Sequence, residues 1–169
     1  MSGPVRVVVA TPEDPDLVQA CGRLVADVYG GEHLLEDEDG YLGTVADAMP
    51  RAREAVLLAA VDDDGLVGTA TYARALSRFA ELAGPGEAEM RMLAVAPAAR
   101  GRGIGRLLTT ACVERAREEG CERFVLSSGP RMTGAHAMYE GMGFDRSPER
   151  DWSPVPGVDL RTYRLPLRP

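Results

Sequence analysis

The residues with the clearest chemical potential form a glycine- and arginine-rich segment that follows an apolar run. Three glycines are interspersed there with three arginines and one isoleucine: Arg100, Gly101, Arg102, Gly103, Ile104, Gly105 and Arg106. Glycine leaves backbone N–H groups unshielded, and the first turn of a helix has unpaired N–H groups and a partial positive charge. Arginine side chains add charge-assisted donors. The segment therefore predicts a site for an anion, such as a pyrophosphate, at the start of a helix.

Two other interpretations of this segment compete with an anion site. A dinucleotide-binding fingerprint requires glycine at position 106, where the chain has Arg106, so that pattern is not met. A purely structural turn would need no ligand. The apolar run before the segment and the amphipathic helical pattern after it favour the anion site.

The elements that must position this segment alternate along the chain. Apolar runs predict strands at residues 5–10, 55–61, 66–72, 90–95, 124–126 and 160–165, with another extended segment from Phe144. Helical spacing predicts helices between about residues 16 and 30, 41 and 49, 104 and 120, and 133 and 140. An Asp-Gly turn at Asp64 and Gly65 predicts a hairpin. We expect a single domain over residues 1–169, with a mixed α/β sheet and helices on both faces.

The composition excludes several classes of function. The 169 residues carry 19 basic and 26 acidic side chains, a formal net charge of −7, which argues against a general role in nucleic-acid binding. Every basic residue is arginine, so a lysine-dependent phosphate loop and Schiff-base chemistry are excluded. No apolar run approaches the roughly 20 residues that cross a bilayer. The three cysteines lack metal or redox spacing, so we expect reduced thiols and no metal site. Because the chain has neither a spanning run nor a signal-like start, we expect a cytoplasmic location.

Two motifs resemble those of a known family. Arg100-x-x-Gly103-x-Gly105, preceded by Leu93-Ala94-Val95-x-Pro97, resembles the acyl-CoA signature of the GNAT superfamily of N-acetyltransferases. The segment Ala137-Met-Tyr139-Glu140-x-x-Gly143-Phe144 resembles a second motif of that superfamily. The order of elements is similar from about Val5 to Leu165. The resemblance implies a mostly antiparallel, twisted sheet of about seven strands with a splayed central pair, and about four helices on both faces.

The resemblance also implies a co-substrate and a reaction. Acetyl-CoA would be held by Leu93, Ala94, Val95 and the segment from Arg100 to Arg106, with its pyrophosphate on the turn and its pantetheine arm on the main chain of Leu93 and Val95. An acetyl group would move to a primary amine by direct attack in a ternary complex. A non-catalytic acyl-CoA sensor is the alternative. Met132 stands where many relatives have asparagine, so the side-chain contact to pantetheine stays open.

Tyr139 and Glu89 are the expected catalytic residues. A phenol with a pKa near ~10 can protonate a departing thiolate, and the resemblance places Tyr139 at the thioester sulfur; the alternative is a tyrosine that only packs. Strand alternation places Glu89 on the same face as Leu93 and Val95, where it could take the amine proton; the alternative is an exposed carboxylate at the start of the strand. His136 shares a helical face with Tyr139 and is either a base, a CoA contact or a surface histidine, the last being favoured.

The amine acceptor is the least defined part of the site. In the resembling fold its walls correspond to residues 29–41 and 151–157, which include the acidic run at residues 36–39 and the pair Asp151-Trp152. Such walls would attract a cationic amine, unless they are only a solvated loop and a tryptophan that covers the core. A hydrolase built on Ser128 and His136 is a third option, although it lacks the Gly-x-Ser-x-Gly elbow. Whether the chain forms a homodimer stays open.

Overall fold

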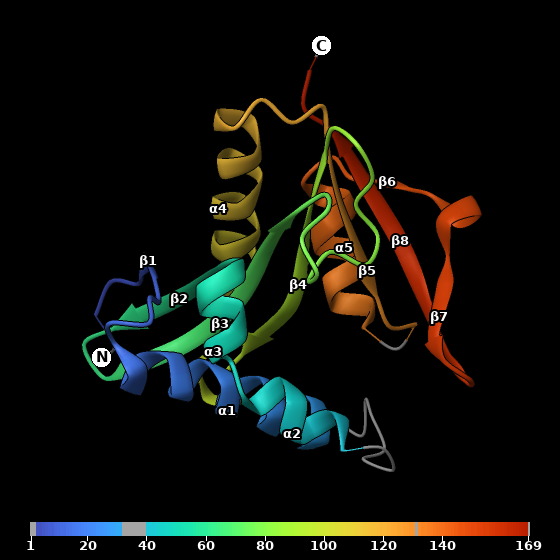
Figure 1. Cartoon of the computed structure of the whole chain (residues 1–169). Helices are drawn as coiled ribbons and strands as arrows, with labels where there is room; N and C mark the ends of the chain where they lie inside the picture. Colours follow the sequence, from blue (N-terminus) through green and yellow to red (C-terminus); the bar gives the residue numbers. More distant parts are fainter. Residues whose placement is uncertain (1–2, 32–39, 131, 169) are drawn as a thin grey trace.

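The computed structural model describes residues 3–31, 40–130 and 132–168, which alternate between strands and helices (Figure 1). The strands are β1 (Arg6–Val9), β2 (Val56–Asp62), β3 (Gly65–Arg74), β4 (Glu87–Val95), β5 (Arg123–Ser128), β6 (Asp145–Arg146), β7 (Trp152–Val155) and β8 (Val158–Pro166). The α-helices are α1 (Pro15–Gly31), α2 (Tyr41–Ala46), α3 (Met49–Glu54), α4 (Ile104–Glu118) and α5 (Thr133–Gly141).

The strands form one mixed sheet in the order β1-β2-β3-β4-β5-β8-β6, and β7 pairs with β8 beside this path. All neighbouring strands are antiparallel except β4 and β5, which are parallel. The expected α/β class, the mixed sheet and the hairpin between β2 and β3 are confirmed.

Two details of the expected element order are wrong. Residues 152–155 were expected to be a loop, but they form β7, an additional strand. The expected helix at residues 41–49 is two short helices, because the backbone of Asp47 is extended and interrupts the helical turns between α2 and α3.

The centre of the sheet is splayed, as expected. β4 pairs with β5 only from Glu87 to Met90, so beyond Met90 its main chain pairs with no described strand on that side. A β-bulge lies at this point: Met92 has a positive φ of 53°, and the register with β3 shifts beside it. A bulge bends its strand and increases the local twist. The bend separates the ends of β4 and β5 and opens a wedge between them.

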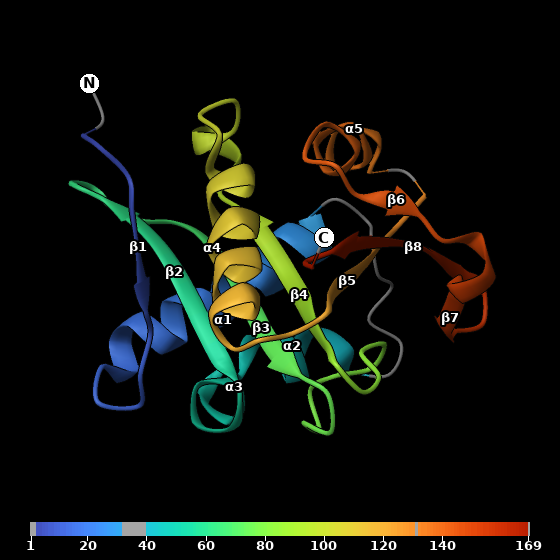
Figure 2. The ribbon, with the colours of Figure 1, turned by 90° about the horizontal axis from the view of Figure 1, so that it is seen from above.

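Helices cover both faces of the sheet, because alternate strand residues point to opposite sides (Figure 2). Leu58 and Ala60 of β2 pack in the core that includes α4 and α5. Leu57 and Ala59 of the same strand pack with α1 and α3 on the other face. The two layers therefore place α4 and α5 together on one side, and α1, α2 and α3 on the other.

The contact between α1 and α2 depends on a glycine. A Cβ atom built on Gly22 of α1 would lie 1.9 Å from the carbonyl oxygen of Ala46, at the end of α2. That oxygen belongs to the backbone, so it cannot move aside by changing a side-chain rotamer. Gly22 thereby fixes how closely the two helices approach.

Replacing this glycine should weaken the fold. We expect Gly22→Ala to lower the free energy of unfolding by about 1–3 kcal/mol, because the added methyl group must push α2 away. Gly31→Ala is the control: Gly31 is also helical, and its built Cβ has no neighbour within 4 Å. Urea denaturation followed by circular dichroism measures both variants. Equal stability of Gly22→Ala and the wild type would contradict this account of the packing.

Candidate active site

The glycine-rich turn connects β4 to the start of α4 and leaves its backbone open. Gly101 and Gly103 have positive φ angles of 81° and 76°, and Gly103 is the N-cap of α4. A Cβ built on either glycine would meet no atom of the described residues within 4 Å, and none of their side chains caps the helix. Among the described residues, the first turn of α4 therefore has N–H groups that no side chain caps, an arrangement that can bind a phosphate.

The arginines of the turn are not equivalent. Arg102 donates to the carboxylate of Asp62 at 2.9 Å and to the carbonyl oxygen of Gly3 at 3.2 Å. This corrects the expectation that its side chain donates to a phosphate: the guanidinium is engaged within the protein, and only its backbone belongs to the open turn. Arg100 and Arg106 are exposed on either side of the turn.

Tyr139 lies on α5, which packs beside the start of α4. A Cβ built on Gly105 would lie 3.6 Å from the sulfur of Met138, the residue before Tyr139. Tyr139 is only 3% exposed, and its ring packs against those of Phe144 and Tyr163 with centroid separations of 5.6 and 5.7 Å.

Burial keeps Tyr139 in its protonated form. It raises the pKa of this phenol, and the nearby phenol of Tyr29 adds to the effect. Its hydroxyl makes no hydrogen bond with another of the described residues. A protonated phenol with no protein partner can donate a hydrogen bond or a proton to a ligand, although the raised pKa makes it a weaker acid than a free phenol.

His136 is buried, so the expectation of a surface histidine is wrong. It is 6% exposed and lies on the same face of α5 as Tyr139; both rings pack against Tyr163. Burial lowers its pKa and favours the neutral imidazole. Its Nε2 and the hydroxyl of Ser128 are both buried without a hydrogen-bond partner in the described chain. The two residues therefore form no nucleophile–base pair, and the hydrolase option loses its support.

Glu89 is an internal anchor and not an exposed acid. It lies within β4, is 1% exposed, and its Oε2 accepts hydrogen bonds from the backbone N–H groups of Glu81, Leu82 and Ala83 at 2.9–3.0 Å. Its Oε1 lies 4.0 Å from the Nε of Arg91. Burial raises the pKa of this carboxyl, and the three N–H groups oppose the shift. The side chain holds the loop between β3 and β4 against the sheet.

The bulge also determines which residues of β4 lie on the same face of the sheet as Glu89. Met90 packs in the core on the side of α4, whereas Met92 packs with α1 and α2. After the bulge, Leu93 and Val95 point to the α4 side. Strict alternation is broken at Met92, so Glu89 does not share a face with Leu93 and Val95 as expected.

The expected acidic walls of the acceptor site take a different form. Asp151 accepts two hydrogen bonds from Arg146, both at 2.6 Å, so its charge is already compensated. The indole N–H of Trp152 donates to the hydroxyl of Ser127 at 3.2 Å. The acidic run at residues 36–39 lies outside the described residues.

A cavity that the sequence did not reveal lies on the α1–α3 side of the sheet. It has a volume of about 610 Å³ and is bounded by α2, α3, the loop after β3 and the bulged part of β4. Its lining includes Tyr41, Arg51, Phe79, Arg91 and Met92. Arg51 was missed because nothing in its local sequence distinguishes it from Arg53, which is exposed on the same helix.

The structure defines a class of protein: an α/β domain with an open glycine-rich turn at the start of a helix, beside a splayed strand pair. The model of the Acetyltransferase (GNAT) family matches residues 24–144. The chain therefore belongs to the GNAT acetyltransferase family, which transfers acyl groups from coenzyme A.

Solved structures share this fold at low sequence identity. A GNAT-family acetyltransferase from Staphylococcus aureus Mu50 is 14% identical, with a TM-score of 0.73 over 98% of this chain and 100% of that one. The ribosomal-protein-S18-alanine N-acetyltransferase from Escherichia coli is 15% identical, with a TM-score of 0.67 over 98% and 96%. The PaiA N-acetyltransferase from Thermoplasma acidophilum, solved with coenzyme A, is 14% identical, with a TM-score of 0.68 over 96% and 99%. No curated protein matches the sequence.

Within residues 3–31, 40–130 and 132–168, no helix is both long and apolar enough to cross a bilayer. The same part of the chain holds no group of three or more His, Cys, Asp or Glu residues placed to bind a metal ion.

A side chain at the open turn should block coenzyme A. We expect Gly103→Val to weaken CoA binding about tenfold or more, because the branched side chain occupies the space in front of the helix and strains a positive φ. Gly157→Val is the control, since Gly157 has a φ of 85° and equally open surroundings in the turn between β7 and β8. Titration calorimetry with CoA measures both. An unchanged affinity in Gly103→Val would remove the turn from the CoA site.

The anchoring role of Glu89 predicts a local effect. Glu89→Gln removes a charged acceptor shared by three N–H groups, so we expect the amides of Glu81, Leu82 and Ala83 to exchange with solvent at least about tenfold faster. Hydrogen-exchange mass spectrometry resolves this loop. A general base would instead show unchanged exchange and the loss of the acidic limb of the pH–rate profile.

Proposed function

We propose that the protein is an acetyl-CoA-dependent N-acetyltransferase that acts on a primary amine through a ternary complex. The observation that carries the proposal is the open first turn of α4 beside the wedge between β4 and β5, with Tyr139 on the adjacent helix. The family membership and the PaiA enzyme solved with coenzyme A support the choice of co-substrate.

The binding groups follow from the geometry. The backbone N–H groups of residues 101–106 would hold the pyrophosphate, with Arg100 and Arg106 as flanking cations and Ile104 buried beneath them. The main chain of Leu93, Ala94 and Val95 lies in the part of β4 that has no partner toward β5, so it can pair with the amide groups of pantetheine. This arrangement would direct the thioester toward the bulge at Met92.

The reaction needs a neutral amine, support for an oxyanion and a proton for the leaving group. The amine nitrogen attacks the thioester carbonyl carbon, a C–N bond forms, and the C–S bond breaks. The amine loses one proton to water, and the departing sulfur takes one from the hydroxyl of Tyr139. We propose that Glu89 acts as a positioning residue in this scheme, because its Oε2 is already committed to three N–H groups of the loop.

Removing the phenolic hydroxyl tests the proposal. Tyr139→Phe should lower kcat by about 100-fold or more while CoA affinity stays within about twofold, because the proton donor is lost and the turn is untouched. Release of free CoA from acetyl-CoA is measured against a panel of amines that includes spermidine, aminoglycosides and short peptides.

Tyr72→Phe is the matched control, because its hydroxyl donates to Glu119 at the far end of α4. We expect it to lower stability and leave kcat unchanged. A wild-type protein that binds acetyl-CoA but releases no CoA with any amine would be a sensor and not an enzyme.

A further inference from the structure

Arg51 is a buried cation without a carboxylate partner among the described residues. It is 2% exposed, and its Nη2 donates to the carbonyl oxygen of Val45 at 2.9 Å. Its Nε is fully buried and has no hydrogen-bond partner. A guanidinium has five N–H donors, so a single protein acceptor leaves most of them unsatisfied. An unpaired buried charge is unfavourable unless a ligand supplies the opposite charge.

The cavity on the α1–α3 side brings this cation together with a second one. Arg51 and Arg91 both line it. Arg91 is already paired: it lies 2.8 Å from Oε1 of Glu81 and donates to the carbonyl oxygen of Phe79 at 3.0 Å. Burial lowers the pKa of Arg51, and the positive charge of Arg91 lowers it further. The protein therefore compensates one guanidinium of the pair and leaves the other uncompensated.

The other charged groups on the cavity do not neutralise Arg51. Asp47 is exposed at the rim, and Arg78 lies 2.7 Å from Glu54. Of the three arginines that line the space, Arg78 and Arg91 are paired with carboxylates, whereas Arg51 has no such partner among the described residues, so the uncompensated charge inside the cavity is positive. A polyamine would meet repulsion there, whereas an anion would be attracted.

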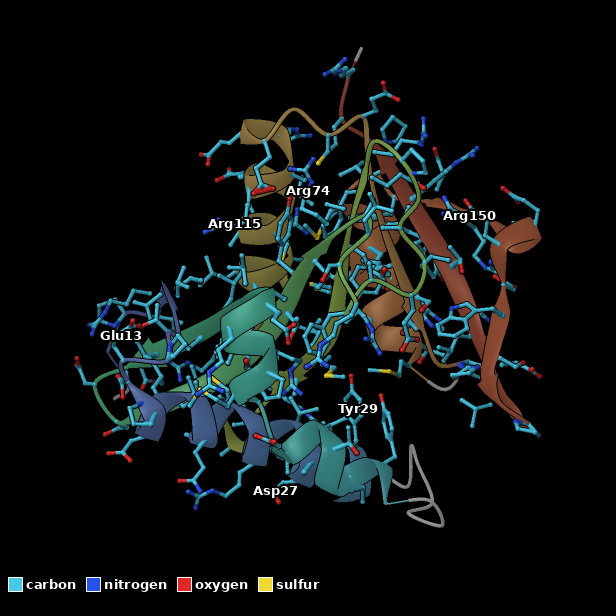
Figure 3. All side chains as sticks on the ribbon, in the orientation of Figure 1. Glu13, Asp27, Tyr29, Arg74, Arg115 and Arg150 are labelled. Carbon is cyan, nitrogen blue, oxygen red and sulfur yellow. The ribbon has the colours of Figure 1, made fainter. Side chains whose placement is uncertain are left out.

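The cavity lies where an acceptor would have to bind. It reaches Met92, the bulge residue at which β4 leaves β5. Tyr29 of α1 packs in the same cluster as Met92, and its side chain extends from the helical layer toward the sheet (Figure 3). The turn that would hold the pyrophosphate begins α4, on the opposite face. A molecule in the cavity could therefore approach a thioester at the wedge from the side away from coenzyme A.

We propose that the amine acceptor carries an anionic group, a carboxylate or a phosphate, which binds Arg51. This inference rests on the proposed function and names the class of its acceptor. The planar guanidinium matches a carboxylate with two parallel hydrogen bonds. An anionic acceptor replaces the cationic acceptor that the sequence predicted from residues 36–39 and Asp151. Arg51 is a specificity-determining residue in this account, and Arg91 with Glu81 shapes the adjoining wall.

A purely structural Arg51 predicts a different outcome. Its hydrogen bond to Val45 lies in the last turn of α2, where a cation can stabilise a helix end. If that were its role, Arg51→Met would lower stability and reduce turnover of all amines alike. If Arg51 binds an anionic ligand, the melting temperature of the ligand-free Arg51→Met variant should equal that of the wild type, because methionine fills similar space without an unpaired charge. Arg53→Met, at an exposed position of the same helix, is the matched control.

The first arm of the test compares matched acceptors. Amino acids and the corresponding amino-acid amides are assayed by CoA release, with kcat/KM referred to the unprotonated amine; aminophosphonic acids distinguish phosphate from carboxylate. We expect the wild type and Arg53→Met to prefer the anionic member at least about tenfold, mainly through KM. In Arg51→Met that ratio should fall to about one. Equal use of acids and amides by the wild type, or a preference for polyamines, would overturn the inference and leave the N-acetyltransferase proposal standing.

The second arm does not depend on turnover. N-acetyl amino acids and their amides are titrated by NMR into the protein saturated with CoA. Binding of the acids to the wild type and its loss in Arg51→Met supports the inference even if no amine is acetylated, which would overturn only the proposed function. The inference about Arg51 would be overturned if acids and amides bound with equal affinity, or if Arg51→Met still bound the acids.

Discussion

The bulge at Met92 is the constraint on which the site depends. A non-glycine residue with a positive φ is strained by about 1 kcal/mol or more, and it persists only where its surroundings hold it. Here β3 pairs with β4 on both sides of the bulge, so the strained residue is fixed by the ladder. The same distortion ends the pairing with β5, reverses the faces of the following residues and exposes main-chain groups to the wedge. One local irregularity thus creates both the wedge between β4 and β5 and one border of the cavity that Arg51 and Arg91 line.

Buried acids hold the surrounding loops in place. Glu89 binds three backbone N–H groups of the loop after β3. Glu87, two residues earlier, accepts hydrogen bonds from both terminal nitrogens of Arg150, at 2.8 and 3.0 Å. Figure 3 shows Arg150 on the segment that precedes β7 and β8. Carboxylates of β4 therefore connect the sheet to the loops on both sides of the site, and their charge is used for structure.

The sequence predicted those parts of the site that depend on local chemistry. The turn with Gly101 and Gly103, the hairpin after Asp64 and the shared face of His136 and Tyr139 all follow from short-range spacing, and the structure agrees. The wrong expectations depended on tertiary structure. Nothing about methionine at position 92 predicts a positive φ, so the face of Glu89 was assigned by an alternation that the bulge interrupts. The burial of Arg51 and the pairing of Arg102 with Asp62 come from contacts between segments distant along the chain. The catalytic role of Tyr139 stays a prediction.

The ion pair between Arg102 and Asp62 joins the glycine-rich turn to the end of β2, which lies at the opposite end of the central strands from the loop held by Glu89. Glycines make a turn adaptable, and an adaptable turn loses conformational entropy when a ligand orders it. A partly buried guanidinium–carboxylate bridge restricts the turn in advance. The β2–β3 hairpin is distant from any reacting atom. Through Asp62 it would nevertheless preorganise the glycine-rich turn and reduce the conformational entropy lost when a nucleotide binds there.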